Sequence, residues 1–285
     1  MKHRTQRINF VFFGSDNFSI GVLAELEKAG FLPAQVVTVP DRPKGRGLAL
    51  SPTPVKEWAL ARSIPVLTPE KLDADFSYTL HATRYTLFIV ASYGKIIPAS
   101  LLNIPEKGAL NVHPSLLPKY RGATPIEGVI LNGETETGVS IIKMDEKVDH
   151  GPILAQEKIA FDIFTETKTE LEARLAVTGG TLLVKTLPEW FAGNILPKAQ
   201  NDSAATLTRL LSKEDGVIDL ADDGLKNFRK FRAYAGWPGT YFYAHRGGKK
   251  VRVTIITARL IEGNLILEKV VPEGRRAVEY KDFLR

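Results

Sequence analysis

Three polar residues carry the clearest potential for chemistry in this sequence. Asn111 and His113 stand two apart in the apolar run from Ala109 to His113, and Pro114 follows directly. Because side chains alternate along a strand, these two project to the same side, and the proline ends the strand there. An amide N–H can stabilise a developing oxyanion, and an imidazole can donate or accept a proton near neutral pH. The spacing predicts a pair that acts together at a strand end.

Asp149 is the expected partner of this pair. It follows an apolar run, residues 138–144, and precedes the Gly151-Pro152 turn, which can bring a carboxylate back towards the strand ends. A carboxylate beside an imidazole fixes the ring and favours its charged form. Taken singly, a histidine before proline is more often a loop residue and an aspartate near glycine is more often a turn former, so the residues alone leave both interpretations open.

Composition excludes several other chemistries. The chain of 285 residues has no cysteine, which rules out disulfides, thiolate metal sites and a cysteine nucleophile. Its five histidines lack metal-ligand spacing, so we expect no metal. The turn at Gly14-Ser15-Asp16 is not G-x-G-x-x-G, and no phosphate-binding loop motif occurs, so a dinucleotide site is not favoured.

Strand-like and helix-like segments alternate through the first two thirds of the chain. This order is typical of an α/β domain with a mainly parallel sheet, whose ligands gather at the carboxyl ends of the strands. The segments are predicted strands at 8–13, 36–39, 86–91, 109–113 and 138–144, and predicted helices at 18–28, 55–62, 125–131 and 167–191.

The pattern of apolar and polar residues changes after a predicted linker that begins near Gly193. Residues 250–257 alternate apolar and polar side chains, and Tyr241 to Tyr243 precede an Arg-Gly-Gly turn, so this part is predicted to be antiparallel. We therefore expect one domain over residues 1–204, including the linker, and a second over residues 205–285.

The formal charge of +6 indicates a polyanionic partner. Arg42, Lys44 and Arg46 lie within five residues of a glycine-rich loop, and residues 226–252 hold eight Lys or Arg without any Asp or Glu. No apolar stretch approaches the roughly 18 residues of a membrane span, and the polar start lacks the apolar core of a signal peptide. We expect a cytoplasmic protein that does not enter a membrane.

The segment around the proposed pair resembles a known signature. Residues 111–125, Asn-Val-His-Pro-Ser-Leu-Leu-Pro-Lys-Tyr-Arg-Gly-Ala-Thr-Pro, together with residues 132–139 and 149–154, are similar to the blocks of the folate-dependent formyltransferases, in the same order. The resemblance implies a Rossmann-like catalytic domain, a smaller C-terminal β-barrel (OB-like) domain that is shortened here, and 10-formyltetrahydrofolate as formyl donor. It implies that Asn111, His113 and Asp149 are catalytic and that Ser115, Leu116, Leu117 and Pro118 line the folate site.

Further segments resemble the members of this family that formylate initiator methionyl-tRNA. They are residues 40–47, 51–56, 92–98, 211–216 and 237–240. The resemblance implies that Arg42, Lys44 and Arg46 contact tRNA and that residues 205–285 form a tRNA-binding domain. No obligate protein partner is indicated, so we expect a monomer. The chain departs from the family pattern at Lys147 and His150, where similar sequences commonly have Gly and Thr.

Two alternatives remain at this point. One is a folate-dependent N-formyltransferase acting on an amino sugar nucleotide, which would use the same three residues but would need no basic loop. The other is a non-catalytic tRNA-binding protein on the same scaffold, which would not need an intact Asn, His and Asp. Both the basic loop and the intact trio are present.

Overall fold

The computed structural model describes residues 8–44, 49–81 and 83–285, and the chain forms two compact units. The first unit comprises residues 1–123, 137–160 and 172–207, and the second comprises residues 124–136, 161–171 and 208–285. Two short segments that precede the linker thus belong to the second unit. A functional boundary at residue 204 stays a prediction.

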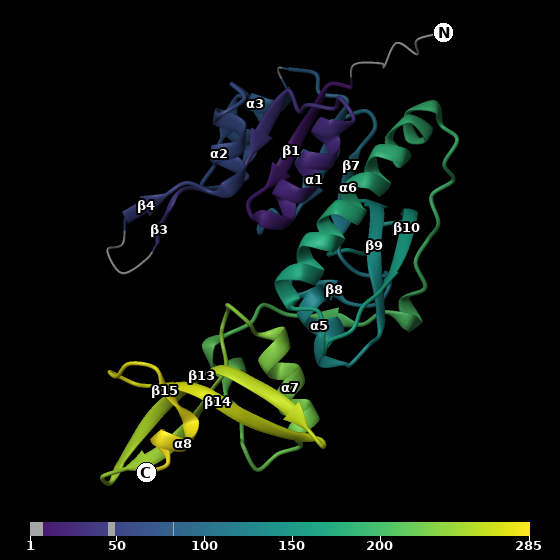
Figure 1. Cartoon of the computed structure of the whole chain (residues 1–285). Helices are drawn as coiled ribbons and strands as arrows, with labels where there is room; N and C mark the ends of the chain where they lie inside the picture. Colours follow the sequence, from purple (N-terminus) through teal and green to yellow (C-terminus); the bar gives the residue numbers. More distant parts are fainter. Residues whose placement is uncertain (1–7, 45–48, 82) are drawn as a thin grey trace. The chain divides into compact units, whose positions relative to one another are not determined.

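A seven-stranded sheet forms the centre of the first unit, in the order β10-β9-β7-β6-β1-β2-β5 (Figure 1). The pairs β1–β2, β1–β6, β2–β5 and β6–β7 are parallel, and β7–β9 is antiparallel, which confirms the predicted mainly parallel sheet. The strands are β1 (Phe10–Gly14), β2 (Gln35–Val37), β5 (Val66–Leu67), β6 (Leu87–Ala91), β7 (Ala109–His113), β9 (Glu136–Lys143) and β10 (Ile153–Ala160).

Helices cover both faces of this sheet. On one face, α6 approaches the strands so closely that a Cβ on its Gly179 would lie 2.6 Å from Val112 Cγ1, and α1 packs against α6 where Gly21 meets Ala176. On the other face, side chains of α3 and α4 pack with strand residues such as Phe88. The helices are α1 (Asn17–Lys28), α2 (Pro54–Leu60), α3 (Ala74–His81), α4 (Ala99–Leu102) and α6 (Lys168–Ala192).

The alternation of side chains along β7 decides on which face of the sheet Asn111 and His113 lie. Ala109 packs in the core on the α3–α4 face, whereas Val112 points towards α6. Asn111 and His113 share the parity of Ala109, so both lie on the face away from α6. Both side chains are buried, at 8% and 4% exposure. The same-side placement predicted from their spacing is therefore confirmed.

The second unit combines helices with a four-stranded antiparallel sheet in the linear order β12-β13-β14-β15. Its apolar core includes Phe242, Val253, Val270 and Phe283. This confirms the predicted smaller antiparallel C-terminal part. The elements are α5 (Pro125–Leu131), α7 (Gly224–Ala233), β12 (Tyr241–Arg246), β13 (Lys249–Ile261), β14 (Asn264–Pro272), β15 (Val278–Glu279) and α8 (Tyr280–Phe283).

Two of the sequence blocks that precede and follow α7 contact each other within this unit. Ser212 and Asp215 form a capping box at the short 3-10 helix Lys213–Gly216. A Cβ on Gly216 would lie only 2.2 Å from the carbonyl oxygen of Gly239, so a glycine is needed for this close approach.

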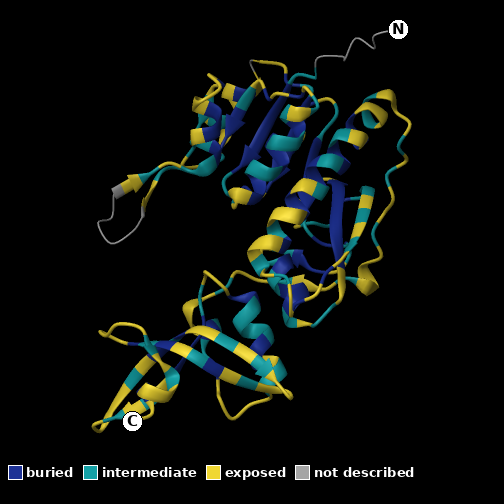
Figure 2. Ribbon diagram, in the orientation of Figure 1, coloured by how far each residue is buried: buried dark blue, intermediate teal, exposed yellow. Residues whose placement is uncertain are grey.

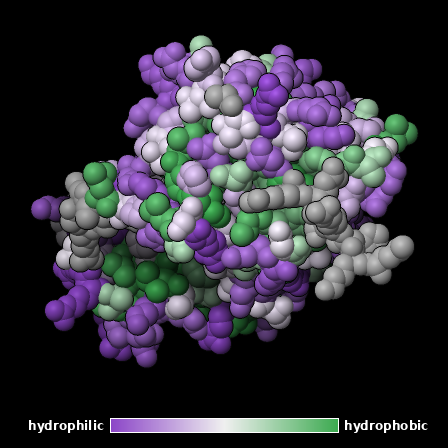
Figure 3. Space-filling model, turned by 90° about the horizontal axis from the view of Figure 1, so that it is seen from above, coloured by the Kyte–Doolittle hydropathy of each residue, from purple (hydrophilic) through white to green (hydrophobic). Residues whose placement is uncertain are grey.

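Short paired strands complete the fold. β3 (Arg42–Lys44) pairs with β4 (Ala49–Ser51), and β8 (Arg121–Gly122) pairs with β11 (Leu207–Thr208). Burial is concentrated in the central strands and the inner sides of the helices (Figure 2). On the face drawn in Figure 3, hydrophilic residues predominate and apolar residues gather in a few patches.

Candidate active site

One carboxylate joins the three predicted residues at the carboxyl end of β7. Asn111 Nδ2 donates to Asp149 Oδ1 at 3.0 Å, and His113 Nδ1 lies 3.5 Å from Asp149 Oδ2. Asp149 comes from the loop between β9 and β10, as its position before the Gly-Pro turn predicted. The fold thus brings Asn111 into direct contact with Asp149, which lies 38 positions further along the sequence.

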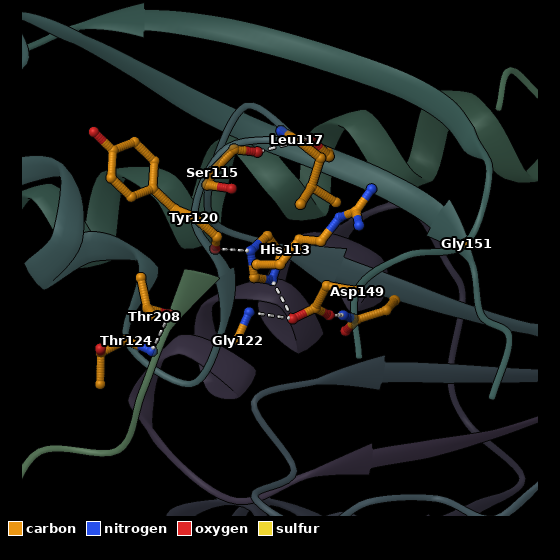
Figure 4. Close-up of polar contacts among 12 residues, drawn as sticks. His113, Ser115, Leu117, Tyr120, Gly122, Thr124, Asp149, Gly151 and Thr208 are labelled. Atoms are coloured by element: carbon orange, nitrogen blue, oxygen red, sulfur yellow. Dashed lines mark hydrogen bonds and ion pairs between the residues drawn. The ribbon is translucent and has the colours of Figure 1, made fainter. Parts of the chain in front are cut away.

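The contact of the second ring nitrogen of His113, Nε2, shows that this nitrogen carries a hydrogen. Nε2 lies 2.9 Å from the backbone carbonyl oxygen of Tyr120 (Figure 4). A carbonyl oxygen can only accept, so Nε2 carries a hydrogen. Nδ1, the other ring nitrogen, faces Asp149 Oδ2. The ring thus has a backbone carbonyl at one nitrogen and a carboxylate at the other.

Backbone groups hold the carboxylate in turn. The N–H of Gly122 donates to Asp149 Oδ2 at 2.9 Å, a contact that is also drawn in Figure 4. Asp149 has a φ of +48°, a left-handed conformation that costs a non-glycine residue about 1–3 kcal/mol. Beyond it, a Cβ on Gly151 would lie 1.9 Å from the carbonyl oxygen of Lys143, so the loop can turn back only because this residue is glycine.

Sequence patterns missed the groups that position the trio. Tyr120 and Gly122 act through their backbone atoms, which side-chain patterns do not reveal. Gln200 lies in the stretch interpreted as linker, yet its Nε2 donates to the carbonyl oxygens of Asp149 and Gly151, both at 2.8 Å. For Tyr120 and Gly122 the available signal was their place within the block that resembles the formyltransferases.

The predicted folate-lining loop follows His113 directly. Ser115 and Leu117 are buried, and their polar groups are engaged within the protein: Ser115 Oγ donates to Lys119 O at 2.7 Å, and Leu117 N donates to Ser140 Oγ at 3.1 Å. Leu116 and Pro118 are half-buried. The two buried residues therefore shape the loop, and the alternate two keep part of their surface exposed.

Two of the three predicted tRNA contacts lie on the β3–β4 hairpin. Arg42 is exposed on β3, Lys44 is the last residue of that strand, and Arg46 lies outside the described residues. At the base of the hairpin, Lys56 Nζ lies 2.7 Å from Asp41 Oδ2. The hairpin is thus joined by an ion pair to α2.

The second basic segment, residues 226–252, divides into two parts. On α7, Lys230 Nζ donates to Val217 O at 2.7 Å, Arg232 donates to Glu166 O, and Arg229 lies against Gly133. Burial lowers the pKa of Lys230 and of Arg232. These three cations serve the packing of the second unit.

The cations of the β12–β13 hairpin are different, because they stand at its surface over aromatic rings. Lys249, Lys250 and Arg252 are exposed. Lys250 Nζ lies 4.1 Å from the ring centre of Tyr243, and Arg252 Cζ lies 5.3 Å from that of Tyr241. The candidate polyanion surface of this unit is therefore the hairpin rather than the whole basic segment.

The two departures from the family pattern leave the trio in place. His150 Nδ1 lies 2.6 Å from Asp145 Oδ2, and its Nε2 lies 3.4 Å from Asp202 Oδ2. Lys147 is exposed, and its backbone N–H donates to Asp145 at 3.0 Å. Both residues are accommodated within the loop that ends at Asp149.

Within the described ranges no cluster of three or more His, Asp or Glu side chains could hold a metal ion. Among the same residues, no helix combines the length and the apolar character that crossing a membrane requires.

Comparisons of this chain with known proteins find formyltransferases. The family model described as formyl transferase matches residues 6–187. A methionyl-tRNA formyltransferase from Myxococcus xanthus is 37% identical over 98% of this chain and 95% of its own length. Among solved structures, a methionyl-tRNA formyltransferase from Clostridium thermocellum aligns with a TM-score of 0.61 and 16% identity, covering 95% of this chain and 99% of its own.

A second solved structure has a different acceptor. It is an N-formyltransferase from Helicobacter canadensis in complex with folinic acid and dTDP-3-aminofucose, with a TM-score of 0.63 and 19% identity over 95% of this chain and 98% of its own. Both structural likenesses show the fold, and they are too similar in score to separate one acceptor from another.

Proposed function

The chain belongs to the formyl transferase family and, within it, to the methionyl-tRNA formyltransferases, and on this basis we propose that it transfers the formyl group of 10-formyltetrahydrofolate to the α-amine of methionine on initiator methionyl-tRNA. The observation that carries the mechanism is the single carboxylate of Asp149 shared by Asn111 and His113. The product would be the formylmethionyl-tRNA used to begin translation.

Formyl transfer to an amine requires three things of the protein. A neutral nitrogen must attack the formyl carbon, the negative charge that develops on the formyl oxygen must be stabilised, and the amine must lose a proton. An ester-bound methionine has a less basic amine than the free amino acid, so much of it is neutral near pH 7. The chain must therefore supply oxyanion donors and a proton acceptor.

Asn111 and His113 are suited to bind the developing oxyanion. The amide of Asn111 has two N–H groups, of which one is donated to Asp149, and the other can be directed to the formyl oxygen. The 3.5 Å between His113 Nδ1 and Asp149 exceeds a normal hydrogen bond, so a hydrogen on Nδ1 would be available to the formyl oxygen. Groups of this kind contribute about 10²–10³ each to the rate.

Asp149 would have two tasks in this scheme. It would hold the imidazole of His113 in place. Its carboxylate would also accept a proton from the attacking amine and pass it to N10 of the folate, which leaves as tetrahydrofolate when the bond between N10 and the formyl carbon breaks. The contacts from Asn111 and Gly122 restrict it to one position. General acid–base groups contribute about 10²–10⁴ to a rate.

For the donor, we propose a site along the loop that follows His113. The half-buried Leu116 and Pro118 offer apolar surface of the kind that a flat organic ring system needs, and the buried Ser115 and Leu117 keep the loop in shape. A folate held there supplies the formyl group. The solved relative with folinic acid is consistent with a folate donor in this fold.

For the acceptor, we propose contacts from Arg42 and Lys44 of the β3–β4 hairpin, from Arg46, and from the exposed cations of the β12–β13 hairpin. Lysine and arginine neutralise backbone phosphates, and aromatic rings beside them suit unpaired bases. Residues 205–285 would be the tRNA-binding domain and residues 1–204 the catalytic domain. We further propose that the protein acts as a monomer in the cytoplasm.

The two alternatives are less well supported. An amino sugar nucleotide as acceptor is compatible with the fold, but the relative that is 37% identical over nearly the whole chain is a methionyl-tRNA formyltransferase. A non-catalytic tRNA-binding protein would have no use for a half-buried carboxylate shared by Asn111 and His113.

The proposal is tested by mixing the protein with 10-formyltetrahydrofolate and charged initiator tRNA, then releasing the amino acid and detecting formylmethionine by mass spectrometry. A parallel reaction contains a dTDP-linked amino sugar in place of the tRNA. We expect formylmethionine in the first reaction and unmodified sugar in the second. Formylation of the sugar alone would favour the other acceptor, and no product in either would contradict catalysis.

A further inference from the structure

The segment of residues 200–206, hereafter the 200–206 segment, contacts the Asp149 loop through one amide. Gln200 Nε2 donates to the carbonyl oxygens of Asp149 and Gly151, both at 2.8 Å. Both donors of this side chain are therefore used on the loop. Since Asp149 has an unfavourable left-handed φ of +48°, its conformation depends on such external contacts.

The same segment also contacts the chain that holds His113. Thr206 Oγ1 accepts from the N–H of Tyr120 at 2.8 Å, and Thr206 O accepts from the N–H of Arg121 at 2.9 Å. Tyr120 is the residue whose carbonyl oxygen receives His113 Nε2–H, and it too has a positive φ, +61°. One short segment therefore supports the partners of both His113 and Asp149.

A charged side chain holds Gln200 itself. Arg121 Nε donates to Gln200 Oε1 at 3.0 Å, and Arg121 Nη2 donates to Asp202 Oδ1 at 2.8 Å. The hydrogen bond from Arg121 lowers the pKa of the Asp202 carboxyl. The hydrogen bond from Arg121 thus fixes the amide oxygen of Gln200, and the NH₂ group of Gln200 is thereby directed at the Asp149 loop.

We propose that Gln200 is a positioning residue for formyl transfer, which acts by holding the backbone of the Asp149 loop so that the carboxylate meets Asn111 and His113. The inference rests on the proposed function and extends it to a segment that sequence patterns assign to a linker. Gln200 touches neither Asn111 nor His113 in this scheme, so all of its effect on turnover passes through Asp149.

The decisive variant is Gln200→Leu, which keeps the volume and removes the donors. Outer hydrogen-bond partners of this kind typically contribute 10- to 100-fold, so kcat should fall about 10-fold or more while the KM of each substrate stays within about twofold. Ser203→Ala is the matched control, because Ser203 Oγ donates its hydrogen bond to Asn201 Oδ1 of its own turn. An unchanged kcat for Gln200→Leu, or an equal loss for Ser203→Ala, would overturn the proposal.

A double-variant cycle separates positioning from general damage. If Gln200 acts through Asp149, adding Gln200→Leu to Asp149→Asn should cost little more than Asp149→Asn alone in single-turnover assays. The same loss in both backgrounds would contradict the proposal. Gln200→Glu provides a second variant of native shape. Its carboxylate can still accept the hydrogen bond from Arg121, but it cannot donate hydrogen bonds to the carbonyl oxygens of Asp149 and Gly151. Wild-type turnover of this variant would also contradict the proposal.

A readout independent of catalysis keeps this inference distinct from the proposed function. Nitrogen-15 NMR of the histidine rings reports the hydrogen bonds and protonation of His113, with His113→Gln used to assign its signals. Gln200→Leu and Gln200→Glu should shift the His113 signals and leave those of His245 unchanged, whereas Ser203→Ala should shift neither. Unshifted His113 signals would overturn the positioning role, even if the wild-type protein formylates tRNA as proposed.

Discussion

Gly122 donates its backbone N–H to the same oxygen of Asp149, Oδ2, that faces His113 Nδ1. The carboxylate is thus shared between a fixed backbone donor and a titratable ring. A backbone N–H cannot be removed by side-chain substitution, so it keeps Asp149 in place when the ring is lost. This makes substitutions at Asn111, His113 and Asp149 tests of chemistry rather than of local folding.

Asn111→Ala should lower turnover by about 10² or more with little change in the KM of either substrate. The amide is proposed to bind charge that develops only in the transition state, so its loss raises the barrier without weakening ground-state binding. Single-turnover formylation by the purified variant measures the effect, with thermal unfolding as the check on folding. A loss below threefold in a normally folded variant would exclude Asn111 from oxyanion stabilisation.

Asp149→Asn should be as damaging as His113→Ala, and the double variant should be little worse than either single one. The carboxylate is proposed to act on the amine and through the imidazole, so the two residues form one functional unit whose effects are not additive. Turnover of the three variants under one set of conditions provides the comparison. Independent losses that multiply in the double variant would show that Asp149 and His113 act separately.

Arg42→Ala should weaken binding of charged initiator tRNA and flatten its salt dependence. Each phosphate contact contributes a slope of about 0.7 to 0.9 in log K against log salt, and Arg42 is exposed on the β3–β4 hairpin. Titrations at several salt concentrations measure both quantities, with Lys185→Ala as a control at an exposed cation of α6. An unchanged slope for Arg42→Ala would shift the proposed contact to Lys250 and Arg252.

Asp215→Asn should destabilise the protein at neutral pH and have little effect in acid. Hydrogen bonds from Arg209, followed by the N–H of Ser212, hold the pKa of the Asp215 carboxyl well below its usual range. A carboxyl whose pKa is lower in the folded state contributes stability above its unfolded value of about 3.9, and that contribution is lost as the pH falls through the folded value.

The melting temperatures of wild type and Asp215→Asn should therefore differ most near pH 7, begin to converge below about pH 4, and come together only as the pH falls to the lower folded value. Thermal unfolding followed by circular dichroism across this range tests the expectation. The exposed Asp282 near the chain end provides a control in Asp282→Asn. A difference that stays constant from pH 7 to pH 3 would show that the ionised carboxylate of Asp215 is not the source of the stability.

The sequence by itself determined the elements and the trio. The run from Ala109 to His113 is a strand with those bounds, the 125–131 helix begins and ends as predicted, and the alternation of segments yields the mainly parallel sheet. These features follow from local periodicity and from proline and glycine positions, which are visible in one dimension. The spacing of Asn111 and His113 likewise fixed their common side.

Tertiary structure alone decided which groups hold the trio and which cations are free to bind. The carbonyl of Tyr120, the N–H of Gly122 and the amide of Gln200 converge on His113 and Asp149 from three places in the chain, and no periodicity encodes a backbone contact. Packing also divided the basic segment, since Arg229 and Arg232 are turned inward while Arg252 is exposed. Composition counts charges, but only the folded chain determines which of them face water.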